Sequence, residues 1–356
     1  MTIPVLPDWT RWSWASQVER EWWQPLVHAA SSAYQDVERW SVVDNVRPAC
    51  RTFIAPERLV EATEWAQRNG ILCVPIGKTA RTNYYSSTSR PLGASEPFDY
   101  QVLYVRPEHY SDTANLNDDR LGELLGYPAC CRAAFANTWG RGQVDSTWEQ
   151  GQTILHGSTS TLLRWMGIRL VSHMPCTYGC SASQEIAEQM FQVGCAHGYR
   201  EEMLAIREML DWPVEWSRLF GIAEIVTPGL KISTRTDWTP QKDAFTKPGT
   251  YRQPQKTWWT HNGFNSADGM RDAHRDMIDA LVTQLPPQAR IVDLGCGNGM
   301  LLRRLTIHRP DIRIAGVDTN ADAIRSAQET MDLRSKYWHG SIQEGTWVDW
   351  TPTAVL

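Results

Sequence analysis

The sequence predicts an α/β protein with more than one domain. Its 356 residues exceed the size of one small core and suggest two or three domains. Towards the N-terminus, apolar strand-like segments alternate with a helical one. Towards the C-terminus, an apolar run leads into a glycine-rich turn and then a helical segment. Both patterns are typical of α/β folds.

Residues 1–115 are predicted to form an N-terminal α/β region. Helical segments up to about Arg47 precede three strands. Pro56–Asn69 is a predicted helix, because Pro56 suits its first turn and Gly70 suits its C-terminal cap. The predicted strands are Cys50–Ile54, Ile71–Ile76 and Tyr100–Val105.

Residues 116–236 are predicted to form a largely helical region that contains most of the clustered Cys and His residues. Ala223–Thr234 is rich in β-branched residues and predicts strands. Residues 237–257 contain three prolines among polar residues and predict a linker. The last region is then residues 258–356. The helices predicted in the second region are Asn117–Gly126, Ala129–Thr138, Thr153–Met166 and Ser183–Leu210.

Composition narrows the class of protein. The net charge of −5 provides no basic footprint for nucleic acid, so we expect no nucleic-acid partner. No apolar run approaches the ~18 residues of a membrane span, and the first residues do not resemble a secretory signal. We therefore expect a cytoplasmic protein without a membrane partner, in which cysteines stay reduced.

Tryptophan is unusually frequent, with 18 residues against 7 phenylalanines. One interpretation is a tryptophan-rich core in which indole N–H groups find partners. The other is a stacking platform for a flat substrate. We favour the core, because no basic residues interleave the tryptophans as stacking on nucleic acid would require.

A strand, a glycine turn and a helix are predicted in succession near the C-terminus. Arg290–Leu294 is an apolar run that contains Asp293, and Met300–Ile307 is the predicted helix. Glycines let the backbone of such a turn approach a ligand closely, and the helix N-terminus faces it. About twenty residues later, the predicted strand Ile312–Val317 ends in Asp318, where nucleotide-binding folds hold a ribose diol. The turn glycines are Gly295, Gly297 and Gly299.

The pattern VDLGCGNG followed by GVD resembles motif I and the next acidic motif of class I S-adenosylmethionine-dependent methyltransferases. The resemblance implies a Rossmann-like domain that binds S-adenosylmethionine. A nicotinamide cofactor is disfavoured, because the G-x-G-x-x-G spacing is not present here. The cofactor-binding residues that the resemblance implies are Asp293, Gly295, Gly297, Asn298, Gly299 and Asp318.

The sequence departs from that family in two ways. After the third predicted strand, Lys336–His339, the family often has an acid that meets adenine, whereas Gly340 and Ser341 follow here. The family fold has seven strands, whereas this sequence ends where Thr353–Leu356 would begin the fourth. The domain is thus predicted to be partial. Truncation is the favoured explanation, the others being a second chain that completes the sheet or a remnant domain.

The segment Trp258–Phe264 precedes the predicted helix of residues 266–285. It is a candidate lid over the cofactor, and His261 and His274 are weak candidates for catalysis. We favour the other interpretation, in which the segment is an aromatic hinge and both histidines are merely partnered.

Two turns carry clustered cysteines. The sequences GYPACC at 126–131 and SHMPCTYGC at 172–180 each lead into a predicted helix, whose N-terminus lowers thiol pKa values. Soft ligands at two such turns favour a metal site, either zinc or an iron–sulfur cluster, although the spacing matches no standard zinc finger. The candidate ligands are Cys130, Cys131, His173, Cys176 and Cys180.

This cysteine region resembles a family with GYP-x-CC and H-x-PC-x3-C patterns, and the resemblance implies no particular chemistry. Two alternatives to metal binding stay open. The cysteines could be small buried hydrophobic residues, or Cys130 or Cys131 could be a nucleophile with His173 as its base. Cys50, Cys73 and Cys195 are predicted core residues.

The predicted function is S-adenosylmethionine-dependent methylation of a small molecule, by a protein with an additional Cys/His metal-binding domain. The alternative is a zinc or iron–sulfur module whose methyltransferase-like half-domain is non-catalytic and serves docking or regulation.

Overall fold

The structure is a computed structural model that describes residues 10–80, 95–143, 145, 147–151, 158–254, 257–330, 335–341 and 350–356. It forms two compact units. Unit 1 consists of Met1–Gly194 and Glu202–Arg252, and unit 2 of Cys195–Glu201 and Gln253–Leu356. The division into regions 1–115, 116–236, 237–257 and 258–356 stays a prediction.

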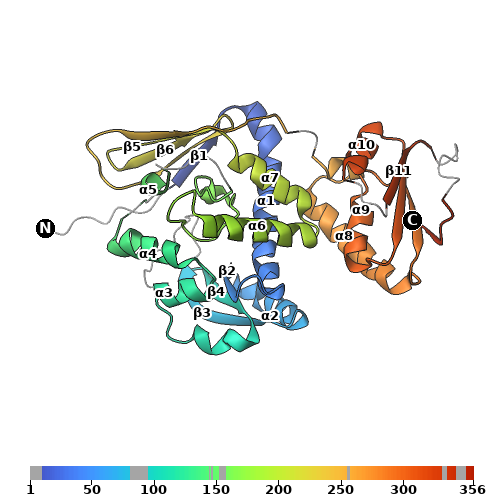
Figure 1. Cartoon of the computed structure of the whole chain (residues 1–356), viewed down its shortest axis with the longest axis horizontal. Coiled ribbons are helices and arrows are strands. Elements are labelled where there is room, and N and C mark those ends of the chain that lie inside the picture. Colours follow the sequence, from blue (N-terminus) through green and yellow to red (C-terminus); the bar gives the residue numbers. More distant parts are fainter. Residues whose placement is uncertain are drawn as a thin grey trace. The chain divides into compact units, whose positions relative to one another are not determined.

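Unit 1 contains a three-stranded antiparallel sheet with the strand order β2-β4-β3 (Figure 1). Its strands are β2 (Ala49–Ile54), β3 (Leu72–Ala80) and β4 (Phe98–Val105), which confirms the three predicted strands. One face packs on the end of α1 (Gln17–Val43) and on α2 (Leu59–Arg68), and the other on α3 (Asp118–Leu124). Gly70 follows α2 with a φ of 71°, as its predicted capping role requires.

A five-stranded antiparallel sheet in the same unit has the strand order β1-β7-β6-β5-β8. Its outer strand β1 pairs with β7, which comes more than 200 residues later in the sequence, at Thr10↔Thr234. The buried face carries Trp216, Ile225 and Ile232. The strands are β1 (Thr10–Trp14), β5 (Val214–Leu219), β6 (Ile222–Val226), β7 (Leu230–Arg235) and β8 (Asp243–Lys247).

The helices between residues 129 and 210 differ from prediction in two places. The predicted helix Thr153–Met166 is wrong over residues 158–163, which form turns, and residues 152–157 lie outside the described residues. Hydrogen bonds from threonine side chains to backbone groups compete with helix formation in this stretch. For example, Thr159 Oγ1 donates to the Tyr178 carbonyl at 2.6 Å. The predicted helix Ser183–Leu210 is two helices, broken at Gly198 with a φ of 84°. The helices are α4 (Ala129–Asn137), α5 (Thr147–Gly151), α6 (Ser181–Ala196) and α7 (Arg200–Leu210).

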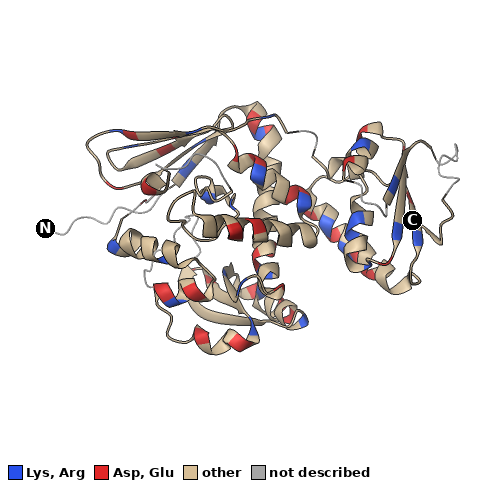
Figure 2. Cartoon of the chain, viewed as in Figure 1, with Lys and Arg blue, Asp and Glu red and all other residues tan. Residues whose placement is uncertain are grey.

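Tryptophans contribute to the core of unit 1. Trp23, Trp212 and Trp216 are fully buried, and the Trp23 indole N–H donates to the Tyr251 hydroxyl at 3.0 Å. At Trp23 both the burial and the hydrogen bond agree with the core interpretation. At Trp212 and Trp216 only the burial agrees, because their indole N–H groups have no hydrogen-bond partner among the described residues. Lys and Arg are interspersed with Asp and Glu along the described helices (Figure 2). Among the described residues, no helix combines the length and the apolar character that a membrane crossing needs.

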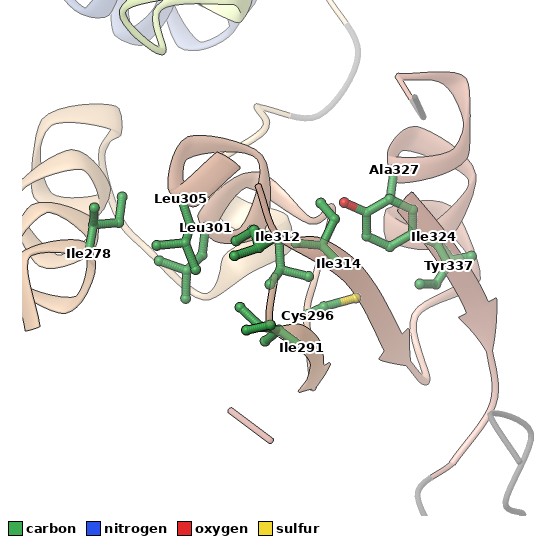
Figure 3. Close-up of a cluster of buried hydrophobic side chains, with 12 residues drawn as sticks. Ile278, Ile291, Cys296, Leu301, Leu305, Ile312, Ile314, Ile324, Ala327 and Tyr337 are labelled. Atoms are coloured by element: carbon green, nitrogen blue, oxygen red, sulfur yellow. The ribbon is translucent and has the colours of Figure 1, made fainter. Parts of the chain in front are cut away.

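Unit 2 is built on a parallel sheet with the strand order β11-β10-β9-β12. One face is covered by helices α8, α9 and α10. Figure 3 shows Ile291 and Ile314 of the sheet together with Leu301 and Leu305 of α9 and Ile324 of α10. The elements are α8 (Ala267–Gln284), β9 (Arg290–Leu294), α9 (Met300–His308), β10 (Arg313–Asp318), α10 (Ala321–Glu329), β11 (Ser335–His339) and β12 (Ala354–Val355).

The other face of this sheet buries Val292, Ala315 and Val317 against Trp350. Strand β12 pairs in parallel with β9 at Ala354↔Ile291, so a strand lies where the fourth was predicted. The parallel order and the covering helices confirm the Rossmann-like α/β fold of the C-terminal part.

Candidate functional site

The glycine turn connects the end of β9 to the start of α9. Gly295, Gly297 and Gly299 all have positive φ, of 93°, 54° and 73°, a region that costs other residues strain. The backbone N–H of Gly295 donates to the Val317 carbonyl at 2.8 Å, which ties the turn to β10. Gly299 then stands at the N-cap of α9. The turn therefore aims a helix N-terminus at the carboxyl edge of the sheet.

Asp318, the last residue of β10, is held by backbone donors on both oxygens. The N–H of Gly297 donates to Oδ2 at 2.8 Å, and that of Asn320 donates to Oδ1 at 2.7 Å. A carboxylate oxygen has two lone-pair directions, so each can still accept a ligand hydroxyl. The sheet and the turn thus fix the orientation of this carboxylate.

Asp293 lies on the neighbouring strand, one residue before its end and opposite Gly316, two residues before Asp318. Burial, followed by the repulsion of the Asp318 carboxylate, raises the pKa of Asp293 to about 6. None of the described residues forms a hydrogen bond to the Asp293 carboxylate. A partly buried acid that repels its neighbour is a site where a cationic group would bind favourably.

The segment Trp258–Phe264 lies against the glycine turn of the same unit. Asn298, only 1% exposed, donates from Nδ2 to the Trp258 carbonyl at 3.0 Å. Asn262 donates from Nδ2 to Asn298 Oδ1 at 2.7 Å. A Cβ atom at Gly297 would stand 2.2 Å from Asn262 Oδ1 and 2.7 Å from the His261 carbonyl oxygen. The segment therefore covers the turn. It can lie this close to the turn because Gly297 has no side chain.

The two candidate catalytic histidines lie in different surroundings. His261 belongs to the short 3-10 turn Thr260–Asn262, beside Gly297. His274 lies on α8 and is 4% exposed, and its Nδ1 accepts from Arg304 Nη1 of α9 at 3.1 Å. Burial and then the Arg304 charge lower the pKa of His274 to about 4. The structure thus places the backbone of His261 against the glycine turn, and His274 at the contact between α8 and α9.

Four cysteines of unit 1 converge on one point. The sulfurs of Cys130, Cys131, Cys176 and Cys180 all lie within 4.8 Å of one another. The Cys130 sulfur is 3.6 Å from that of Cys180 and 3.9 Å from that of Cys131, and the Cys131–Cys180 separation is 3.7 Å. The two cysteine-bearing turns therefore meet, as a shared metal site requires.

His173, the fifth candidate ligand, stands behind this cluster. Its Nε2 is 2.7 Å from Ser183 Oγ, which in turn is 3.3 Å from the Cys131 sulfur. Ser183 therefore lies between the imidazole and the thiol. Ser183 is not among the predicted site residues, although its position three residues after Cys180, near the start of α6, is a signal that could have indicated it.

The thiols of the cluster differ in acidity. Burial raises the pKa of Cys176 to about 11 and moves that of Cys131 well above its usual range. Burial also acts to raise the pKa of Cys180, but hydrogen bonds, those of Ser183 foremost, outweigh it and lower the value to about 7. Cys50 is a fully buried core residue, and Cys296 is buried in the glycine turn.

Comparison with known proteins bears on the C-terminal part. Residues 255–347 match the methyltransferase small domain family. The C-terminal part of the chain is a methyltransferase domain. The matched residues include the glycine turn, Asp293 and Asp318. The second resemblance, that of the cysteine region, stays a prediction.

Two curated proteins to which this chain is similar are methyltransferases. Ribosomal RNA small subunit methyltransferase C of Erwinia tasmaniensis is 27% identical over 146 residues, which are 41% of this chain and 40% of that protein. Trans-aconitate 2-methyltransferase of Azoarcus sp. strain BH72 is 35% identical over 75 residues, which are 21% of this chain and 29% of that protein. The chain thus spans less than half the length of either relative.

Two solved structures show local likeness. One is the complex of the Haloferax volcanii Trm112 methyltransferase activator with a methyltransferase, at 27% identity over 20% of this chain and 34% of that chain, with a TM-score of 0.18. The other is a Plasmodium falciparum protein-L-isoaspartate O-methyltransferase in complex with S-adenosyl-L-homocysteine, at 23% identity over 22% of this chain and 40% of that chain, also with a TM-score of 0.18.

Proposed function

We propose that the protein is an S-adenosylmethionine-dependent methyltransferase whose cofactor binds at the glycine turn of unit 2. The observation that carries the proposal is the pair Asp293 and Asp318 at the carboxyl ends of adjacent parallel strands, beside a helix N-terminus. Open α/β sheets bind ligands at this edge. When bound, the cofactor supplies an activated methyl group on a sulfonium, which a substrate nucleophile takes.

The residues of the turn suit the parts of this cofactor. Asp318 would accept hydrogen bonds from the ribose hydroxyls, because its carboxylate is already oriented by two backbone N–H groups. Asp293 would hold the ammonium group, since a cation relieves its repulsion with Asp318. Because the three glycines have no side chains, they would let the cofactor lie close to the protein backbone.

The segment Trp258–Phe264 would close one side of the pocket as a lid. Its hydrogen bonds to Asn298 already hold it on the turn. Such a lid excludes water and positions the methyl group, and these two effects would supply most of the catalysis. His261 is the better placed of the two candidate catalytic histidines, because its backbone borders Gly297.

We propose a small-molecule substrate. The support is the net charge of −5 and the mixed charges of the described helices, since RNA binding draws most of its affinity from basic surfaces (Figure 2). The names of the two relatives point in different directions, one to ribosomal RNA and the other to trans-aconitate. An RNA substrate is therefore the alternative outcome of the test.

The test is calorimetric titration of S-adenosylmethionine into the full chain and two variants. Asp318→Asn should weaken binding by about tenfold or more, because hydrogen bonds to a charged acceptor contribute ~1.5–3 kcal/mol. Asp322→Asn changes an exposed acid four residues away, at the start of α10, and should bind as the unchanged protein does. Absence of binding at millimolar ligand would refute the proposal. Transfer of labelled methyl to RNA rather than to small metabolites would refute only the substrate class.

A second function is favoured by the cysteine cluster: we propose that it binds a metal, zinc or iron. Four sulfurs within 4.8 Å of one another are the supporting observation. Metal analysis of freshly purified, anaerobically handled protein beside Cys176→Ala tests it, and absence of metal in both would refute it. If metal is present but S-adenosylmethionine does not bind, the protein is better described as a metal module with a non-catalytic methyltransferase-like domain.

A further inference from the structure

The separations of the cluster sulfurs match the edges of one small tetrahedron. A zinc ion lies ~2.3 Å from each thiolate, and the corners of such a tetrahedron are about 3.8 Å apart. The three Sγ–Sγ separations given above are 3.6, 3.7 and 3.9 Å. The fourth sulfur, that of Cys176, lies within the same 4.8 Å limit. This is the spacing of four ligands around a single ion.

An iron–sulfur cluster requires a wider arrangement. In such clusters the cysteines are shared among two or four irons bridged by sulfide, so not all of the thiolates meet at one centre. Here every sulfur is close to every other, which leaves no space between them for bridging sulfides. Tetrahedral four-sulfur coordination of one ion is characteristic of zinc.

The fold compensates the charge that such a site would carry. Four thiolates and one Zn²⁺ have a net charge of −2. Cys130 and Cys131 lie in the first turn of α4, and Cys180 immediately precedes α6, so two positive helix ends meet the sulfurs. The N–H of Cys176 also donates to the Cys131 sulfur at 3.3 Å.

A side-chain relay fixes the orientation of Cys131. A zinc-bound thiolate can only accept, so with the ion bound the Ser183 hydroxyl would donate to Cys131 and would accept from His173 Nε2–H. His173 is 6% exposed and its ring packs on Tyr127 at 5.1 Å, which holds the imidazole in place. Outer-shell residues of this kind orient metal ligands.

We propose that Cys130, Cys131, Cys176 and Cys180 hold one zinc ion as a tetrathiolate, with Ser183 as a positioning residue that His173 keeps directed at Cys131. The inference rests on the metal binding proposed above and names its ion, its coordination and its outer shell. His173 is thereby an outer-shell residue and not a ligand.

The first test is the zinc, iron and labile sulfide content of the full chain, together with the absorption spectrum after replacement by Co²⁺. One zinc per chain without sulfide, and the intense visible bands of tetrahedral thiolate-bound Co²⁺, are expected. Iron in place of zinc, with or without sulfide, would overturn this inference while metal binding stands. No metal at all would overturn both.

The second test addresses Ser183 through zinc affinity, measured by competition with a chromophoric chelator. Ser183→Ala should weaken zinc binding by about 10- to 100-fold. Ser183→Thr, which keeps the hydroxyl, should restore most of the affinity, and Ser181→Ala, an exposed serine of the same helix, should not change it. Unfolding curves of the zinc-free proteins separate affinity from stability. Equal zinc affinity in Ser183→Ala and Ser181→Ala would overturn the role of Ser183.

Discussion

The side-chain amide of Asn262 donates a hydrogen bond of 2.7 Å to the side-chain oxygen of Asn298. It joins the aromatic segment before α8 to the glycine turn after β9, 36 residues later in the chain. Asn298 also donates to the Trp258 carbonyl, so the segment contacts both the oxygen and the nitrogen of its side-chain amide. Asn298 would therefore shape the cofactor pocket by holding its cover.

Replacement of Asn262 by Ala should loosen this segment. The buried Asn298 oxygen would lose its donor, which costs about 1–3 kcal/mol. The change should appear as altered tryptophan fluorescence from Trp258 and Trp259 and as weaker S-adenosylmethionine binding. Asn265→Ala, at an exposed position immediately after the segment, is the matched control. Equal fluorescence and affinity in the two variants would contradict the role of Asn262.

Gly297→Ala should be far more damaging than Gly263→Ala. Both glycines have positive φ, so both substitutions incur the strain of that region, about 1–2 kcal/mol. Only at Gly297 would the new Cβ also meet a backbone carbonyl, that of His261, at 2.7 Å, whereas it would meet nothing within 4 Å at Gly263. Chemical denaturation and cofactor titration of both variants measure the difference. Similar losses of stability and of cofactor affinity in the two variants would mean that the segment Trp258–Phe264 moves away from the new methyl group at little cost.

Asp293→Asn should stabilise the ligand-free protein while weakening the cofactor complex. The pKa of Asp293 rises from 3.8 to about 6 in the folded state, so that state binds the proton more tightly than the unfolded chain. The contribution of Asp293 to stability is therefore greatest below pH 3.8 and declines as pH rises to about 6. At pH 7 the variant should be more stable by about 2–3 kcal/mol.

Denaturant unfolding at pH 7 and pH 4 tests this for Asp293. The extra unfolding free energy of Asp293→Asn should shrink towards zero at pH 4, because the Asp293 carboxyl of the folded original protein is largely protonated there. An advantage that does not depend on pH would argue for a packing effect instead. Unweakened binding of S-adenosylmethionine by the variant would separate Asp293 from the cofactor site.

His274→Gln should remove an acid sensitivity of unit 2. Burial lowers the pKa of His274 from 6.5 to about 4, so between these values the unfolded chain takes up the proton first. Its contribution to stability is complete above pH 6.5 and falls by about 3 kcal/mol as pH drops to 4. Glutamine can still accept from Arg304 without binding a proton. A pH dependence of unfolding equal to that of the original protein would refute this assignment.

Sequence signals predicted the elements of the methyltransferase domain because those signals are local. Strand β9, the glycine turn and Asp318 follow one another within thirty residues, and each carries its own residue preference. The convergence of two cysteine turns was also predictable, since both contain unusual ligand-type residues. The same local rules failed at residues 158–163, where threonine side chains compete with the helix.

Other features depend on partners that are distant in sequence. Strand β8 lies within the stretch predicted as a linker, and only its pairing with β5 makes it a strand. Ser183 belongs to the cysteine site only because it contacts the sulfur of Cys131, 52 residues earlier. Asn262 likewise belongs to the glycine-turn site because of its hydrogen bond to Asn298. A serine at a helix start or an asparagine in a loop is too common to indicate such a contact by itself.

The pairing of β1 with β7 joins Thr10 to Thr234, which are 224 residues apart. At a synthesis rate of about 5–20 residues per second, β1 would wait roughly 11–45 s on the ribosome for its partner. During that interval its tryptophans, Trp12 and Trp14, would lie on an unpaired strand edge, a template for wrong pairing. The five-stranded sheet of unit 1 therefore leaves β1 open to wrong pairing until the residues of β7 have been synthesised.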